Sequence, residues 1–258
     1  MTHPAAPRQL SLLAADATPP GLADLEGLLC GTGHVVRGLG ALAGTARLSV
    51  LVDEPWRVAA LEARLDELDL LEPCRAAPTP TRPEAVSVRT RFDARLLPFA
   101  LRWTRGATPV APDDLFLDGP RLWWWAVSAG VPDKGTGGRG FRLRLAASAP
   151  ERWVRVGAAL ADVGVAGIFL GPRADGPAYR FVGTRRLRRL TDLVGGAPPG
   201  TPPSTWPSDG LEPGRARAVS HRLPEPSSAG DDHPPGTRTA STTTNSSTTG
   251  TTTGTTDR

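Results

Sequence analysis

The sequence has few of the residues from which common metal and catalytic sites are built. Only two of its 258 residues are cysteines and only four are histidines. Cys30 and Cys74 lie far apart and form no Cys-x-x-Cys or Cys/His spacing, which argues against a disulfide scaffold and against the common structural zinc motifs. Because the histidines are scattered as well, we expect no histidine-ligated metal centre, no Ser-His-Asp triad and no cofactor.

Long apolar runs are missing too. No stretch approaches about 18 uninterrupted apolar residues, and the N-terminus lacks a basic segment followed by an apolar one. We therefore expect a soluble, cytoplasmic protein that has neither a secretory signal nor a membrane partner.

Lysine is almost absent, and the positive charge is unevenly distributed. Lys134 is the single lysine among 30 basic residues, although a GC-rich coding sequence would favour arginine without any functional selection. The formal net charge of +4 hides a contrast between −3 over residues 1–120 and +8 over residues 121–196. A basic stretch of this kind is typical of a surface that binds an anionic partner.

The C-terminal part of the chain has the composition of a disordered segment. Its proline- and glycine-rich sequence ends in a low-complexity run of Thr, Ser and Gly, which has almost nothing apolar to bury. The predicted segments are an N-terminal segment (1–19), two folded halves (20–119 and 120–196) and a disordered tail (197–258). Within the tail, Trp206 either docks on the folded part or lies exposed in a linker.

The folded part contains a repeat of helices and strands with an offset of about 97 residues. Helical spacing of apolar residues and period-two alternation occur in the same order in both halves. The first half is predicted to contain helix 21–31, hairpin 35–53, helix 54–71, strand 84–92 and helix 94–103. The second is predicted to contain helix 120–130, strand 141–147 in a hairpin, helix 149–165, a hairpin around Asp175-Gly176 and helix 185–195. We interpret both halves as αββαββα units of an α+β fold.

The first helix of each half carries a degenerate version of one motif. Residues 25–33 (LEGLLCGTG) and residues 122–130 (LWWWAVSAG) resemble the LAGLIDADG motif of homing endonucleases. The matching positions are Leu25, Gly27, Leu28 and Gly33 in the first motif helix and Leu122 and Gly130 in the second. Over about residues 20–196, the layout also resembles the N-terminal part of WhiA-type bacterial regulators, which carry a degenerate LAGLIDADG-like core.

This resemblance implies two pseudo-symmetric halves joined through their motif helices, whose small residues let the helices approach closely. Each half would contribute a curved antiparallel sheet, and the two sheets would form a saddle that lies on duplex DNA. We expect the run Trp123–Trp125 in the second motif helix to pack in the core and between the halves. A stacking platform for unpaired bases is the alternative.

Cleavage of DNA is not expected from this sequence. In the active nucleases that the motif resembles, the last acidic residue of each motif binds the divalent cations that cleave phosphodiesters. The corresponding residues are Thr32 and Ala129, and neither offers the carboxylate that a hard cation such as Mg²⁺ requires. We interpret the nearest acids, Glu26 and Asp133, as ordinary solvated charges, and we predict that the chain is not an enzyme.

Strand alternation places arginines on the sheet faces that the helices leave open. Apolar residues alternate with arginines along each readable strand, and no acidic residue stands among the arginines. The predicted DNA-binding residues are Arg47, Arg89, Arg91, Arg142, Arg144 and Arg180. The loop 134–139 would lie at the rim of this surface. The set favours contacts with phosphates and groove edges, and an ordinary solvated sheet face is the alternative.

These observations favour a non-catalytic protein that binds duplex DNA, with regulation of transcription implied by the WhiA-type resemblance. Where those regulators carry a helix-turn-helix domain, this chain has its Thr/Ser/Pro-rich tail. One alternative is a protein-interaction scaffold with no nucleic-acid role, and residual endonuclease activity is the least favoured. The arginine run 185–189 is explained by a solvated helix face, with a grip on backbone phosphate as its second interpretation.

Overall fold

The computed structural model describes residues 14–15, 19–76, 84–133, 135, 140–173 and 176–208, without the side chains of residues 73–76. The chain divides into two units, Met1–Pro213 and Gly214–Arg258, and all described residues belong to the first. Three predictions fall wholly or mostly outside the described residues. They concern the tail beyond residue 208, the rim loop 134–139 and the turn at Asp175.

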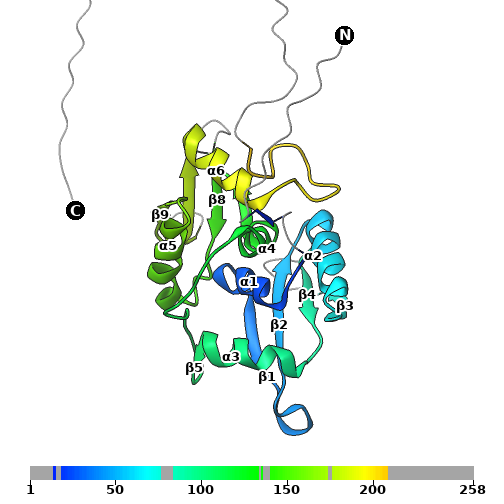
Figure 1. Ribbon diagram of the computed structural model, residues 1–258. Coiled ribbons are helices and arrows are strands. Elements are labelled where there is room, and N and C mark those ends of the chain that lie inside the picture. Colours follow the sequence, from blue (N-terminus) through cyan, green and yellow to red (C-terminus); the bar gives the residue numbers. More distant parts are fainter. Residues whose placement is uncertain are drawn as a thin grey trace, which may run out of the picture. The chain divides into compact units, whose positions relative to one another are not determined.

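The first half begins with a short 3₁₀ segment that runs into the first motif helix, and it ends with a helix after the fourth strand (Figure 1). Its elements are η2 (Leu22–Leu25), α1 (Glu26–Cys30), β1 (His34–Arg37), η3 (Gly40–Leu42), β2 (Ala46–Val52), α2 (Pro55–Glu67), β3 (Leu71–Ala76), β4 (Val86–Thr90), η4 (Ala94–Leu96) and α3 (Leu97–Trp103). A short hairpin follows, whose strands β5 (Thr104–Arg105) and β6 (Thr108–Pro109) have two residues each.

The second half repeats the same order. Its elements are α4 (Gly119–Ala129), β7 (Gly130–Pro132), β8 (Gly140–Arg144), η6 (Pro150–Arg152), α5 (Trp153–Asp162), β9 (Ile168–Leu170), β10 (Ala178–Val182) and α6 (Thr184–Val194). The sheets are antiparallel and share one strand order, β1-β2-β4-β3 in the first half and β7-β8-β10-β9 in the second. The predicted pair of αββαββα units is therefore confirmed.

Local sequence explains why these elements form and which face each one buries. Along β2, Leu48, Val50 and Val52 are buried, while the alternate residues are partly or fully exposed. Helix α2 begins with a proline in its first turn, where the missing N–H costs no hydrogen bond, and it buries Leu61 and Leu65. These apolar faces join one core, in which the motif helices α1 and α4 lie side by side between the two sheets (Figure 1).

The ordered chain reaches beyond residue 196, so the prediction of disorder is wrong for residues 197–208. Trp206 is only 8% exposed, and its ring meets the edge of Trp56 with 6.4 Å between the ring centroids. Its indole Nε1 donates a hydrogen bond to the Gly195 carbonyl at 3.1 Å. Burial of this large side chain and its hydrogen bond offset part of the cost of ordering this short polar segment. No helix in the described part of the chain is long and apolar enough to cross a bilayer.

Candidate nucleic-acid interface

The two motif helices cross at a glycine. A Cβ atom on Gly27 would overlap the Arg121 carbonyl oxygen of α4 and lie 2.9 Å from Trp124 Cβ. A Cβ on Gly31 would lie 2.6 Å from Trp125 Cδ1. The close approach that the motif implies is therefore confirmed, because glycine removes the atoms that would hold the helices apart.

The matched leucines lie in the core, and the remaining motif glycines lie at the ends of the two motif helices. Leu25, Leu28 and Leu122 are buried in the core. Gly33 follows the end of α1, where its N–H donates to the Leu28 carbonyl at 2.9 Å. Gly130 follows the end of α4, where a side chain would lie 2.5 Å from Phe141 Cζ.

The tryptophan run of α4 lies in the core, as expected. Trp124 and Trp125 are fully buried and Trp123 is 5% exposed. Trp125 Nε1 donates to the Arg144 carbonyl at 2.8 Å, which ties the helix to β8. The guanidinium of Arg64 on α2 lies 3.7 Å from the centroid of the Trp123 ring, so this ring bridges the halves. A stacking platform for bases is excluded by this burial.

A buried arginine of the first half caps the motif helix of the second. The Arg57 guanidinium, on α2, donates to the carbonyl oxygens of Ala126 (3.3 Å), Val127 and Gly130 (2.6 Å). Its Nε also donates to Glu54 at 2.7 Å. The last carbonyls of a helix have no intrahelical donors and carry partial negative charge, so a cation there is stabilising.

The reciprocal contact exists at the other motif helix. Arg152, in η6 of the second half, donates to the carbonyls of Leu29 (3.0 Å) and Gly33 (3.5 Å) at the end of α1. Its guanidinium also lies over the Trp103 ring, 5.4 Å from the centroid. Burial lowers the pKa of Arg152 to about 10. Each half thus caps the other half's motif helix.

Sequence spacing does not single out these two arginines. Arg57 and Arg152 each lie four residues before a buried apolar residue, but so do the exposed Arg155 and Arg186. Their burial follows from the contact between the two halves, which no local pattern shows.

Thr32 and Ala129, at the acidic positions of the motifs, line one small cavity of about 150 Å³. The Arg57 guanidinium forms part of its wall, and Glu54 there accepts hydrogen bonds from Arg57 and from Trp56. Asp53 also lines the cavity. A hard divalent cation requires several oxygen ligands and is repelled by a fixed guanidinium. These residues do not fit the catalytic cation of the motif, and the described residues contain no group of three side chains able to hold a metal.

The predicted arginines of the first half lie among carboxylates. Glu72 on β3 pairs with both Arg47 (3.6 Å) and Arg89 (3.0 Å). Arg91 makes two hydrogen bonds to Asp69, of 2.9 and 2.7 Å, and lies 3.7 Å from Asp93. The prediction that no acid stands among the arginines is therefore wrong.

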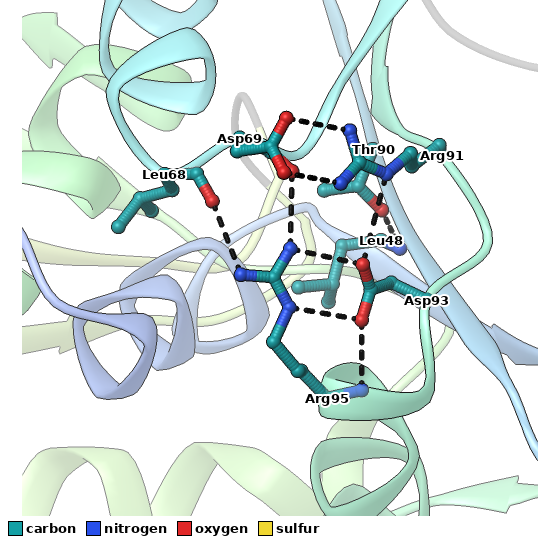
Figure 2. A network of polar contacts seen from close by, with 7 residues as sticks. All are labelled: Leu48, Leu68, Asp69, Thr90, Arg91, Asp93 and Arg95. Atoms are coloured by element: carbon teal, nitrogen blue, oxygen red, sulfur yellow. Dashed lines mark hydrogen bonds and ion pairs between the residues drawn. The ribbon is translucent and has the colours of Figure 1, made fainter.

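These contacts extend into a surface network (Figure 2). Arg95 binds the Asp93 carboxylate through Nε (3.0 Å) and Nη2 (2.9 Å). The hydrogen bonds from Arg95 lower the pKa of Asp93 to about 2. Arg95 also donates to the backbone carbonyls of Leu68 and Asp69, which joins the end of α2 to the segment after β4.

The second half keeps more positive charge on its open face. Arg142 and Arg180 are paired in register on β8 and β10, and both lie against Asp133. Arg144 is exposed, forms no ion pair with any described residue, and lines a second cavity of about 300 Å³. Arg142 and Arg180 share the Asp133 carboxylate, whereas Glu72, Asp69 and Asp93 surround the three arginines of the first half.

The interpretation of Glu26 and Asp133 as solvated charges is also wrong. Both are buried, Glu26 at 5% and Asp133 at 4% exposure. Glu26 lies between Arg102 (3.3 Å) and Arg121 (3.2 Å) and accepts a hydrogen bond from Trp103 Nε1. The backbone N–H of Asp133 donates to the Gly140 carbonyl, which extends the hairpin and brings the carboxylate beside Arg180. Buried carboxylates persist only where such partners compensate their charge.

Comparison with solved structures defines the class of this fold. The homing endonuclease I-WcaI bound to its DNA recognition sequence aligns with a TM-score of 0.52 and 12% identity, over 66% of this chain and 78% of that chain. The N-terminal LAGLIDADG domain of DUF199/WhiA aligns with a TM-score of 0.46 and 8% identity, over 68% of this chain and 80% of that chain. I-DmoI in complex with DNA and Mn aligns with a TM-score of 0.39 and 13% identity, over 68% of this chain and 96% of that chain.

The chain therefore has a LAGLIDADG-like fold. The degenerate motif lies on α1 and α4, the two helices that cross between the sheets. Neither a family model nor a curated protein matches the sequence.

Proposed function

We propose that this protein binds duplex DNA on the open faces of its two sheets and does not cleave it. The observation that carries the proposal is the placement of arginines on those faces in both halves. Five of them stand on β2, β4 and the equivalent β8 and β10 of a LAGLIDADG-like fold, and Arg91 directly follows β4. I-WcaI, which shares this fold, is bound to its DNA recognition sequence. Guanidinium groups suit phosphate oxygens because they donate two parallel hydrogen bonds.

The second half contributes more to this binding than the first. The carboxylates around Arg47, Arg89 and Arg91 compete with phosphates for the same donors. Arg142 and Arg180 share the Asp133 carboxylate, and Arg144 on β8 forms no ion pair with any described residue, so these four side chains carry a net positive charge. Phosphate contacts dominate affinity for DNA, so the less neutralised face binds more tightly.

The absence of cleavage is supported by the ends of the motif helices. Thr32 and Ala129 supply no carboxylate, and the Arg57 guanidinium adds a positive charge to the cavity that they line. Supercoiled plasmid incubated with the protein and Mg²⁺ or Mn²⁺ is expected to remain supercoiled. Nicking that co-purifies with the protein and disappears in an Asp53→Asn variant, which removes a carboxylate lining this cavity, would contradict this part of the proposal.

Paired charge-removing variants test the binding surface. We expect Arg144→Gln with Arg180→Gln to lower the slope of log affinity against log salt by about 2, since each phosphate contact contributes about 0.9. The matched control removes two exposed arginines that pair with Asp113, Arg105→Gln with Arg155→Gln. Fluorescence anisotropy with a labelled duplex measures both. Equal slopes for both double variants would refute the open-face surface.

A protein-interaction scaffold is the second candidate, favoured by apolar residues on the same open faces. Val36 on β1, Leu51 on β2 and Ile168 on β9 are 43%, 37% and 47% exposed. A partner recovered by pull-down in equal amount with and without nuclease treatment would support it. Regulation of transcription, with the cytoplasmic location that it requires, rests on the sequence resemblance alone. Chromatin immunoprecipitation would test it.

A further inference from the structure

A groove of about 840 Å³ lies where the end of β10 meets the first turns of α6. Ala161, Gly164 and Ala166, from the end of α5 and the following loop, form one wall. Four arginines of α6 form the other wall: Arg185, Arg186, Arg188 and Arg189. This groove is separate from the six arginines of the open sheet faces, none of which lines it.

The amphipathic pattern of α6 explains why the arginines face the groove. Leu187, Leu190 and Leu193 are buried, and α6 packs on α4 through this stripe. The arginines occupy the intervening positions, where Arg185, Arg186 and Arg188 are exposed and Arg189 is half-buried.

These arginines differ from those of the sheet faces in their neighbours. Asp192 is the single carboxylate among the described residues that line the groove. Arg185, Arg186 and Arg189 form no ion pair with any described residue, whereas five of the six predicted sheet arginines do. The five paired sheet-face guanidiniums must exchange a carboxylate for a phosphate, whereas these three arginines of α6 need not.

The start of α6 adds backbone donors to the same groove. Gly183 precedes the helix with φ of 88°, and no side chain caps the first turn. The first helical hydrogen bond runs from the Leu187 N–H to the Gly183 carbonyl, so the N–H groups of Thr184–Arg186 have no acceptor within the helix. Such N–H groups at the positive end of a helix dipole favour a phosphate.

We propose that the α6 groove binds backbone phosphates of the same duplex, as a second contact surface beyond the open sheet faces. The inference rests on the proposed function. A mobile small anion would satisfy one or two guanidiniums. Four arginines along one and a half turns of helix match successive phosphates of a nucleic-acid strand better, because the strand presents charge at regular intervals.

The experiment compares Arg185→Gln with Arg186→Gln against the control Arg105→Gln with Arg155→Gln, which removes equal charge elsewhere. All four arginines are exposed, and the near-identical melting temperatures expected would show that both variants fold. Labelled-duplex anisotropy is measured across a salt series. We expect the groove variant to bind at least 10-fold more weakly at low salt and to lower the log–log slope by about 2, with little change in the control.

Three outcomes would overturn the inference in distinguishable ways. If the groove variant matches the control while Arg144→Gln with Arg180→Gln loses affinity, the proposed function stands and the groove has no part in it. If the wild-type protein binds no duplex, both fail together. If 1 mM inorganic pyrophosphate abolishes only the groove's contribution, at an ionic strength held constant, the groove's occupant is a small phosphate compound and not the backbone.

Discussion

Replacing Arg57 with methionine is expected to destabilise the fold strongly, although Arg57 is a charged residue. Arg57 is 4% exposed, and its guanidinium donates to three carbonyls at the end of α4. Methionine fills much of the same volume but donates nothing, so these buried carbonyls lose their partner. Each buried group left without a hydrogen bond costs about 1–3 kcal/mol. Removing one member of a buried charged contact typically costs about 3–5 kcal/mol in all.

We therefore expect the free energy of unfolding to fall by about 3–5 kcal/mol, against the roughly 5–15 kcal/mol that stabilise an ordinary domain. Urea unfolding followed by tryptophan fluorescence measures it. The control is Arg155→Met, which removes an exposed ion pair with Asp113 (2.7 Å) and is expected to cost less than about 1 kcal/mol. A loss for Arg57→Met no larger than that of the control would refute the argument that the halves are joined by reciprocal helix caps.

Three further changes test other parts of the structure. Gly27→Ala should cost more than the roughly 1–3 kcal/mol typical of overpacking, since the new methyl meets the backbone of α4; a melting temperature equal to that of the parent would place the helix crossing elsewhere. Asp93, whose pKa is lowered to about 2 chiefly by hydrogen bonds from Arg95, stabilises the fold above its ordinary pKa of 3.8, and this contribution is lost as the pH falls toward 2. Asp93→Asn should therefore flatten the dependence of unfolding free energy on pH between about 4 and 2, and an unchanged acid limb would contradict this. Glu72→Gln should tighten duplex binding and steepen the salt slope by up to about 1 per arginine released; unchanged affinity would mean that the first half's open face does not contact DNA.

The order of elements was predictable because it rests on local periodicity. The alternation in β2, the apolar stripe of α6 and the two degenerate motifs each predict a strand or helix from about ten consecutive residues. The motif glycines were predictable as the crossing point for the same reason, since only glycine permits so close an approach.

No residues were assigned to strand β3 from the sequence, and this explains the wrong prediction that the sheet face carries no acid. Its sequence, LEPCRA, has no clear alternation and contains Pro73. Proline is tolerated there because β3 is an edge strand, and its pairing with β4 shifts register between Glu72 and Arg75. Without this strand, nothing in the sequence places Glu72 opposite Arg89.

The acids and arginines that pair across the fold could not be read from sequence spacing. Asp133 accepts a hydrogen bond from Arg180, which lies 47 positions away in the sequence, and Arg57 donates to the carbonyl of Gly130, which lies 73 positions away. Only the tertiary structure brings such groups together. Trp206 was ambiguous because composition describes a whole segment and cannot show that one side chain docks.

The most direct test of the central claim is equilibrium binding of the wild-type protein to a fluorescent duplex in chelator, from 50 to 300 mM salt. If arginines of the second half's open face bind phosphates without a divalent cation, binding is saturable at low salt. Its log–log slope is then about −3 or steeper, with roughly 0.9 per contact, and chelator has no effect. No saturable binding at low salt, or binding that appears only when Mg²⁺ or Mn²⁺ is added, would contradict the account.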